Sequence, residues 1–189
     1  KTLLDESDAR FSREEGGWFL TENVDETLIS RTFDPYDSVR PSGNSTLLEA
    51  NLRYSALTGS QKRHKVVEST LGSYAAMVSR GGLGMAGWAT VALMLRGPFY
   101  DVVFAGAVGA EDLQSLQAEY AALAPSWSVR ATVSGAGPTQ EQLKAMPALM
   151  AKTSRQGAAR AYVCIRGTCK KPTGDARELR AQVLDGWTR

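Results

Sequence analysis

The apolar residues of this chain change their spacing near Gly97-Pro98, and this change constrains the fold more than any other feature of the sequence. Before it, apolar residues recur every three or four positions, which is the period of amphipathic helices. After it, short apolar runs alternate with helical stripes, a pattern typical of strands joined by helices. We therefore expect a mainly α chain with an α/β tail, with a helical part over residues 1–97 and a small α/β part over residues 98–189.

In the helical part, apolar side chains at helical spacing predict a helix from Thr46 to the stop at Gly59. A second helix is expected over about Gln61–Ser79 and a third one up to Gly97-Pro98, so short connections favour helical hairpins. Upstream, two apolar runs flank a polar turn, which predicts a β-hairpin at about residues 17–31.

In the second part, three segments have the pattern of strands and are separated by helical stripes. They are Asp101–Gly106, Trp127–Val133 and Ala161–Arg166. Strands that alternate with helices favour right-handed crossovers, because each helix returns the chain to the end of the sheet at which the previous strand began. We expect a small, mainly parallel three-stranded sheet.

Composition and charge exclude several classes of function. No apolar run approaches the roughly 20 residues that span a bilayer, and the first residues lack the pattern of a secretory signal. We therefore expect no membrane partner and a cytoplasmic protein, or an organellar one if a leader has been removed. The net charge of +2 argues against a nucleic-acid partner.

The charges are nevertheless unevenly distributed. Between Gln142 and Gly174 the chain carries basic residues without any acidic one, and we interpret them as a solvated basic face or as partners of the acidic N-terminal segment. These residues are Lys144, Lys152, Arg155, Arg160, Arg166, Lys170 and Lys171.

The candidate catalytic residues are carboxylates, because glycoside hydrolysis needs two of them across a cleft. Asp37 lies just before a predicted helix start, where free N–H groups favour polar or anionic ligands. Its alternative role is a capping carboxylate that accepts backbone hydrogen bonds. Glu15, next to Glu14, is the second candidate, and its alternative is an exposed acid pair. The single histidine, His64, lies among basic residues and is interpreted as a surface residue.

The candidate ligand-binding residues surround the same helix start. Asn44 and Asn51 are expected on one helix face, where they bind ligand hydroxyls or form a buried network that holds neighbouring loops. Ser42 is expected near the ligand. Trp18 and Tyr36 either stack on a sugar ring or belong to the core of the expected hairpin.

Cys164 and Cys169 are the only cysteines of the chain. Their spacing differs from that of a thioredoxin active site, and two cysteines do not complete a structural zinc site. We expect neither a metal nor a cofactor. The pair is either a buried strand thiol with a nearby turn thiol, or a redox-linked pair.

Several motifs, in order along the chain, resemble one family throughout. They are Glu15-Gly16-Gly17-Trp18-Phe19, Tyr36-Asp37, Pro41-Ser42-Gly43-Asn44-Ser45, Leu57-Thr58-Gly59, and Ala161-Tyr162-Val163-Cys164 with Cys169 and Pro172. With these motifs the chain resembles the C-terminal portion of the spermatogenesis-associated, thioredoxin-domain (YyaL-like) proteins.

The resemblance implies a preceding thioredoxin-like domain and an (α/α) toroid similar to N-acylglucosamine 2-epimerases and six-hairpin glycosidases. This chain would supply the last helical hairpins of a partial toroid and the α/β segment, with the missing portions of the same protein as its partners. The implied function is that of a fragment of a sugar isomerase, epimerase or glycosidase-like enzyme with a sugar-like ligand, catalytically incomplete alone. The alternative is a non-catalytic scaffold or interaction module that docks a thioredoxin-like domain or a partner protein.

Overall fold

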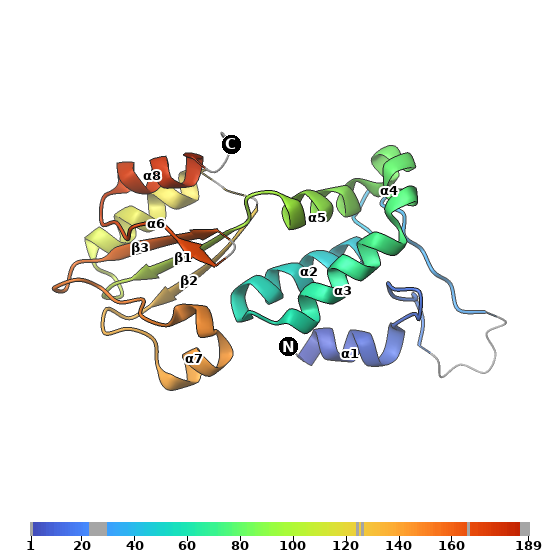
Figure 1. Ribbon diagram of the computed structural model, residues 1–189, viewed down its shortest axis with the longest axis horizontal. Coiled ribbons are helices and arrows are strands. Elements are labelled where there is room, and N and C mark those ends of the chain that lie inside the picture. The colour runs from blue at the N-terminus through green and yellow to red at the C-terminus, as the bar shows by residue number, and fades with distance from the viewer. Residues whose placement is uncertain (1, 23–29, 124, 126, 166, 186–189) are drawn as a thin grey trace. The chain divides into compact units, whose positions relative to one another are not determined.

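The computed structural model describes residues 2–22, 30–123, 125, 127–165 and 167–185. It divides into two compact units (Figure 1). One unit comprises Lys1–Ser55 with Ser60–Arg96, and the other comprises Ala56–Gly59 with Gly97–Arg189. A mainly helical first part and an α/β second part are therefore present, as the periodicity predicts.

The N-terminal unit is built from helices. They are α1 (Thr2–Phe11), α2 (Gly43–Thr58), α3 (Gln61–Ser73), α4 (Ala75–Arg80), the 3-10 helix η1 (Gly82–Met85) and α5 (Ala86–Arg96). Gly59 ends α2 with a φ of +71°, and Ser60 caps α3 by accepting a hydrogen bond from the Arg63 N–H. The helix expected over Gln61–Ser79 is in fact interrupted at Tyr74, between α3 and α4.

The start of α2 lies earlier than the sequence suggests. The helix begins at Gly43 rather than at Thr46, because the hydroxyl of Ser42 accepts the N–H of Ser45 at 3.0 Å in the manner of an N-cap. Asn44 and Ser45 therefore lie within the first turn of the helix.

Large apolar side chains from α2, α3, η1 and α5 form the core of this unit. The fully buried ones are Leu48, Val67, Met85, Trp88, Val91 and Met94. The indole N–H of Trp88 donates to the carbonyl oxygen of Pro35 at 2.8 Å. This bond satisfies the one polar atom of the indole ring and ties the Pro35 loop to α5.

The β-hairpin expected at about residues 17–31 is not formed by the described residues. Trp18 to Glu22, Ser30 and Arg31 have no strand structure apart from an isolated bridge of Trp18 with Ser12, and Thr27–Ile29 lie outside the described residues. The side chain of Asn44 takes both backbone hydrogen bonds of Trp18, whereas the N–H of Leu20 donates to the carbonyl oxygen of Thr32 at 2.9 Å. The turn and most of the second arm of the expected hairpin lie outside the described residues.

The C-terminal unit contains a mixed sheet. Its strands are β1 (Tyr100–Ala105), β2 (Ser128–Val133), β3 (Arg160–Ile165) and β4 (Thr168–Cys169), in the order β2-β1-β3-β4. β1 is parallel to β2, whereas the pairs β1–β3 and β3–β4 are antiparallel. The expectation of a mainly parallel three-stranded sheet is therefore wrong.

The connections before β2 and before β3 contain helices of different length. α6 (Glu111–Leu123) has 13 residues and extends about 20 Å, which matches a six-residue strand and returns the chain for a parallel β2. α7 (Gln140–Ala145) has six residues and extends only about 9 Å, followed by the 3-10 helix η2 (Pro147–Leu149). The chain enters β3 at the same end of the sheet at which it leaves β2, so β3 runs antiparallel to β1.

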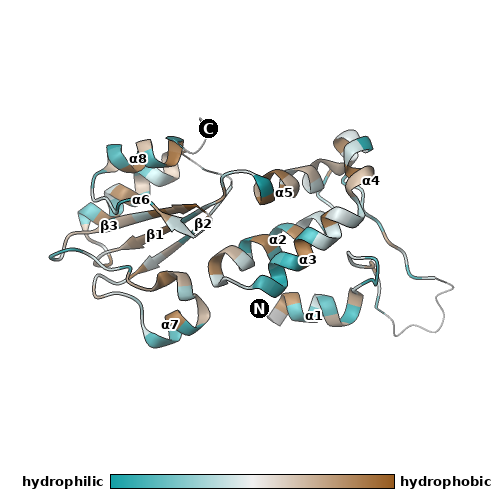
Figure 2. Cartoon of the chain, in the orientation of Figure 1, coloured by the Kyte–Doolittle hydropathy of each residue, from teal (hydrophilic) through white to brown (hydrophobic). Residues whose placement is uncertain are grey.

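Two separate apolar clusters cover the faces of the sheet. One face carries Tyr100, Val102 and Phe104 and packs on α6 and α8 (Ala176–Leu184), whereas the other carries Val103, Ala105 and Tyr162 and packs on Leu149 of η2. Figure 1 shows α6 and α8 on one side of the sheet and α7 on the other, and Figure 2 shows the apolar character of β1 and β3.

None of the helices within the described residues has both the length and the apolar character needed to cross a bilayer.

Candidate functional site

The carboxylate of Asp37 is held by three hydrogen-bond donors of the N-terminal unit. Oδ1 accepts the backbone N–H of Ser42 and the hydroxyl of Ser45, both at 2.7 Å, and Oδ2 accepts the backbone N–H of Gly87, also at 2.7 Å. Burial acts to raise the pKa of Asp37, but these hydrogen bonds outweigh it and lower the pKa below its ordinary value. Asp37 is therefore an ionised acceptor that joins its own loop to the starts of α2 and α5.

The space around this carboxylate is tightly filled. A Cβ atom on Gly87 would lie 2.7 Å from Oγ of Ser45 and 3.0 Å from Oδ1 of Asp37, so the close approach of α5 requires a glycine at this position. Ser42 is buried, and its hydroxyl donates to the hydroxyl of Ser45 at 3.1 Å. Asp37, Ser42, Ser45 and Gly87 form the cluster that we name the Asp37 brace.

Asn44 makes a second set of internal bonds one residue before Ser45. Its Oδ1 accepts the N–H of Trp18 at 2.8 Å, and its Nδ2 donates to the carbonyl oxygens of Trp18 at 3.0 Å and of Asp34 at 3.1 Å. Only 1% of Asn44 is exposed, and 3% of Trp18. The geometry corresponds to the buried-network alternative for Asn44, and the Trp18 ring lies in the core rather than on a surface that a sugar ring can reach.

Asn51 belongs to a buried ionic network around Arg63. Its Nδ2 donates to the carbonyl oxygen of Leu47 at 2.8 Å, and its Oδ1 accepts from the guanidinium of Arg63 at 3.2 Å. The same guanidinium pairs with Asp8 at 2.6 Å and with Asp5. The indole N–H of Trp18 donates to the other oxygen of Asp8 at 3.1 Å.

Sequence reasoning did not single out Arg63, which lies in a basic run at the start of α3. The available signal is its helical spacing from Val67 and Thr70, which are both buried, because this spacing places Arg63 on the inner stripe of the helix. His64, one position further on, is partly exposed and lies 3.5 Å from Glu68.

Glu15 and Tyr36 are the two candidate residues that remain accessible. The carboxylate of Glu15 is 69% exposed and pairs with Arg13 at 3.3 Å. Tyr36 is 54% exposed, and its ring lies near Gly84 of η1. Neither side chain is part of the Asp37 brace.

The two cysteines of the C-terminal unit face each other across β3 and β4 and are joined in a disulfide. Neither cysteine is therefore a free thiol, and the interpretation as two unconnected thiols is wrong. Cys164 is 5% exposed, whereas Cys169 lies in an exposed two-residue strand. The disulfide thus joins one buried and one exposed residue.

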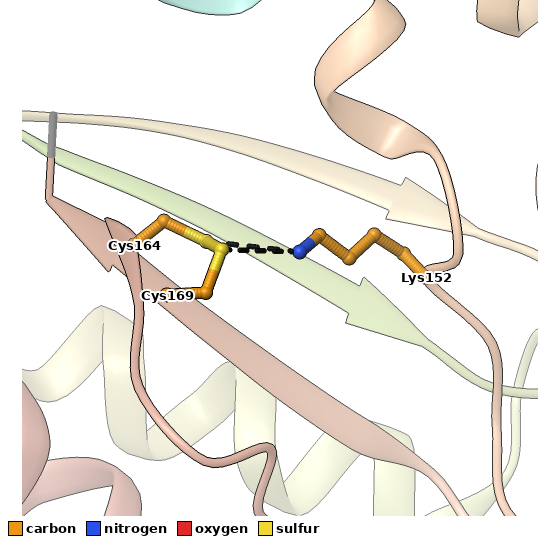
Figure 3. Close-up of a disulfide and its surroundings, with 3 residues drawn as sticks. All are labelled: Lys152, Cys164 and Cys169. Atoms are coloured by element: carbon orange, nitrogen blue, oxygen red, sulfur yellow. Dashed lines mark hydrogen bonds between the residues drawn. A yellow bond between two sulfur atoms is a disulfide. The ribbon is translucent and has the colours of Figure 1, made fainter. Parts of the chain in front are cut away.

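The ammonium group of Lys152 lies next to this disulfide. Nζ is 3.1 Å from Sγ of Cys169 and 3.8 Å from Sγ of Cys164 (Figure 3). It also lies 4.8 Å from the centre of the Tyr162 ring. Burial lowers the pKa of Lys152, and the nearby charge of Asp101 acts in the opposite direction.

Asp101 occupies the same face of the sheet. It is the register partner of Cys164 across β1 and β3, which brings their Cβ atoms to within about 5 Å of each other. Burial raises the pKa of Asp101 to about 6 although the charge of Lys152 acts to lower it. Its Oδ1 is buried without a hydrogen-bond partner among the described residues.

Sequence reasoning missed both charged residues of this site. It assigned Lys152 to a solvated basic face and treated Asp101 only as the first residue of a strand. The available signal is that Asp101 precedes Val103 and Ala105 at a spacing of two, so it shares the face on which these apolar residues are buried.

In the part of the chain that the structure describes, no group of three or more His, Cys, Asp or Glu side chains is placed to hold a metal ion. No model of a protein family, no curated protein and no solved structure matches this chain.

Proposed function

We propose that this chain is the C-terminal portion of a YyaL-like protein and that its helical unit is a non-catalytic framework. In this proposal α2, α3 and α5 are the last helices of an (α/α) toroid. The observation that carries the proposal is the hydrogen bonding of the Asp37 carboxylate. Its two oxygens accept three hydrogen bonds from the protein itself.

A catalytic carboxylate needs a different environment. A general acid or base works best with a pKa near the operating pH and must reach the proton that it transfers. The pKa of Asp37 is instead lowered, and its oxygens are directed at Ser42, Ser45 and Gly87. These properties suit a residue that stabilises a loop between two helix starts.

The amides of the same region support the framework role. Asn44 makes three hydrogen bonds to backbone atoms of two loop residues, and Asn51 bonds to Leu47 and Arg63. Both side chains are almost completely buried. A buried amide with satisfied bonds has little capacity left for a ligand, because each new bond would have to replace an existing one.

An exposed apolar group next to the brace supports the role of an interaction module. Val39 is 101% and Leu83 91% exposed, and Tyr36 is 54% exposed. Their two segments are tied together, because the N–H of Asp37 donates to the carbonyl oxygen of Gly84 at 2.8 Å. In this proposal the group docks the thioredoxin-like domain or a partner protein.

The second candidate is a carbohydrate-binding function, and one observation favours it. The Tyr36 ring is more than half exposed beside the Asp37 loop, and an accessible aromatic ring of this kind can stack on a sugar face. This function requires Asp37 or Glu15 to contact the sugar as well.

The Asp37→Asn variant separates the two functions in the longest natural form of the protein. We expect its free energy of unfolding to fall by about 2 kcal/mol, because the amide weakens charge-assisted hydrogen bonds from three donors. Urea denaturation measures this change, and calorimetric titration with N-acetylglucosamine and glucose 6-phosphate measures binding.

Glu14→Gln is the matched control, since it removes a carboxylate from an exposed turn residue. We expect this control to have wild-type stability and neither substitution to alter sugar binding. If Asp37→Asn abolishes sugar binding while stability stays at the wild-type value, the framework proposal is wrong and the carbohydrate site is supported.

A further inference from the structure

The surroundings of the Cys164–Cys169 disulfide differ from those that a purely structural cross-link requires. Such a cross-link needs only the two cysteines, yet here an ammonium group lies 3.1 Å and 3.8 Å from the two sulfurs. Figure 3 shows the Lys152 side chain extending from its loop toward both sulfur atoms. Removing an ammonium group from water is costly. Lys152 is partly buried, and the charge of Asp101 and the contacts with the two sulfurs offset part of this cost.

Neighbouring residues hold the Lys152 side chain in place. The hydroxyl of Tyr162 donates to the carbonyl oxygen of Thr153 at 2.6 Å and accepts the N–H of Thr153 at 3.1 Å. The Tyr162 ring then lies beside the ammonium group of Lys152 at 4.8 Å. The loop that carries Lys152 is therefore fixed to β3, the strand that contains Cys164.

The two sulfurs differ in access. Cys164 is 5% exposed within β3, whereas Cys169 is exposed in the short edge strand β4. A thiolate must approach the sulfur that it attacks along the direction of the S–S bond, and only Sγ of Cys169 lies on an exposed residue. The sulfur that leaves is then the buried Sγ of Cys164.

We propose that the Cys164–Cys169 disulfide is a redox-active site that exchanges with thiols, with Cys169 as the attacked sulfur and Lys152 as the cation that stabilises the released Cys164 thiolate. This activity is independent of the framework function assigned to the helical unit, because all its residues belong to the C-terminal unit. The substrate class is a dithiol reductant.

The reaction balances with a dithiol as the co-reactant. One thiolate of the dithiol attacks Sγ of Cys169, the S–S bond breaks, and its electron pair remains on Sγ of Cys164 as a thiolate beside Lys152. The second thiolate of the dithiol then attacks its own sulfur in the mixed disulfide and releases the thiolate of Cys169. The dithiol is oxidised to a disulfide, and the protein gains two electrons and, from the solvent, two protons.

Lys152 contributes most when Cys164 becomes charged. An opposite charge within about 4–6 Å lowers a thiol pKa by about 1 to 3 units, and a leaving thiol with a lower pKa departs faster. In the reduced protein the same ammonium group favours the thiolate of Cys169, which is the nucleophile of the reverse reaction. Lys152 is therefore a positioning and charge-stabilising residue for both directions.

The first experiment maps the attacked sulfur. The oxidised full chain is incubated with glutathione, quenched with iodoacetamide and analysed by peptide mass spectrometry. We expect the glutathione adduct on Cys169 and the alkyl group on Cys164. An adduct found mainly on Cys164, or a disulfide that stays intact in millimolar glutathione, overturns the proposal.

The second experiment tests Lys152 through the rate of reduction by glutathione at pH 7. We expect Lys152→Met to be reduced roughly fivefold to tenfold more slowly than the wild type, because the leaving thiolate loses its cation. Lys144→Met, an exposed lysine in α7, is the matched control and should react at the wild-type rate.

Lys152→Arg keeps the positive charge and should recover most of the rate, which a purely structural role of the side chain does not predict. Equal rates for Lys152→Met and Lys144→Met contradict the role of Lys152. If Lys152→Met does not fold, as judged by circular dichroism, the adduct position in the wild type and the rate of Lys152→Arg decide the question.

Discussion

Each of the two units contains a partly buried aspartate, and the two aspartates have opposite environments. In the N-terminal unit the carboxylate of Asp37 accepts three hydrogen bonds, and its pKa is lowered. In the C-terminal unit Asp101 has an oxygen without a hydrogen-bond partner among the described residues, and its pKa is raised to about 6. Asp101 is the more deeply buried of the two aspartates, and it also lacks the three donors that surround Asp37, so burial and the missing donors together account for the difference.

This contrast separates stabilising polar groups from reactive ones. Polar groups whose hydrogen bonds are all satisfied hold loops and helices in one arrangement. A reaction at such a group would break these hydrogen bonds and disturb the fold. A carboxylate with an unpartnered oxygen and an ammonium group beside a disulfide that joins a buried and an exposed cysteine have capacity left for a reaction. Cys164, Cys169 and Tyr162 of the second environment belong to the motifs on which the resemblance rests, whereas Lys152 and Asp101 lie outside them.

The largest effect is expected for Arg63→Met, which removes the buried cation of the N-terminal unit. Breaking a buried ion pair by removing one partner typically costs 3 to 5 kcal/mol. We expect a loss of about 3 kcal/mol in the free energy of unfolding, since Asp5 and Asp8 keep partial access to water. Urea denaturation measures the loss.

Lys65→Met is the control for this change, because Lys65 is exposed on the same helix. It should alter stability by less than about 0.5 kcal/mol. A similar effect of both substitutions would show that the ionic network does not brace the unit.

A smaller loss is expected for Gly87→Ala, which adds a methyl group inside the Asp37 brace. The new Cβ would lie 2.7 Å from Oγ of Ser45, so either α5 or the Ser45 side chain must shift. Overpacking of this kind costs about 1 to 3 kcal/mol. Thermal unfolding followed by circular dichroism reports the loss.

Gly43→Ala is the paired control, because no atom lies within 4 Å of its added Cβ. Alanine is also a better helix former than glycine, so this variant should be as stable as the wild type or slightly more stable. Equal stability of the two variants would contradict the tight packing around Asp37.

The smallest change in stability is expected for Asp101→Asn, and it depends on pH. The folded protein binds a proton at Asp101 more tightly than the unfolded chain does, since the pKa rises from 3.8 to about 6 on folding. The stability of the wild type therefore falls as the pH rises through the window from about 4 to 6. The side-chain amide of the Asp101→Asn variant does not titrate, so the variant avoids this loss of stability.

We expect the free energy of unfolding of Asp101→Asn to match that of the wild type near pH 4. At pH 8 it should be higher by roughly 1 to 2 kcal/mol, reduced by the attraction between Asp101 and Lys152 that the variant loses. Glu141→Gln, an exposed residue of α7, should show no such pH-dependent difference. Urea denaturation at both pH values provides the comparison.

Much of the fold follows from the periodicity of the sequence. The stripes of Leu48 and Leu52 and of Val67 and Leu71 correctly predict α2 and α3, and the strand at Asp101–Gly106 is found as β1. These features depend on neighbours close in the chain, which a sequence pattern records directly.

The features that the sequence did not predict depend on distant neighbours. The antiparallel direction of β3 depends on its pairing with β1, and the hydrogen bonds between Trp18 and Asn44 join residues 26 positions apart. Lys152 and the disulfide likewise come together only through tertiary folding. A sequence of charges alone does not distinguish a solvated lysine from one placed beside a disulfide.

The contrast between the two units is tested most directly by measuring the pKa values of Asp37 and Asp101 in one sample. A titration of the side-chain carboxyl carbons by nuclear magnetic resonance gives both values, with Asp37→Asn and Asp101→Asn providing the assignments. We expect Asp37 to titrate below its ordinary value of 3.8 and Asp101 at about 6. Two carboxyl groups that titrate together near pH 4, or in the reverse order, would contradict the division into a satisfied brace and a reactive site.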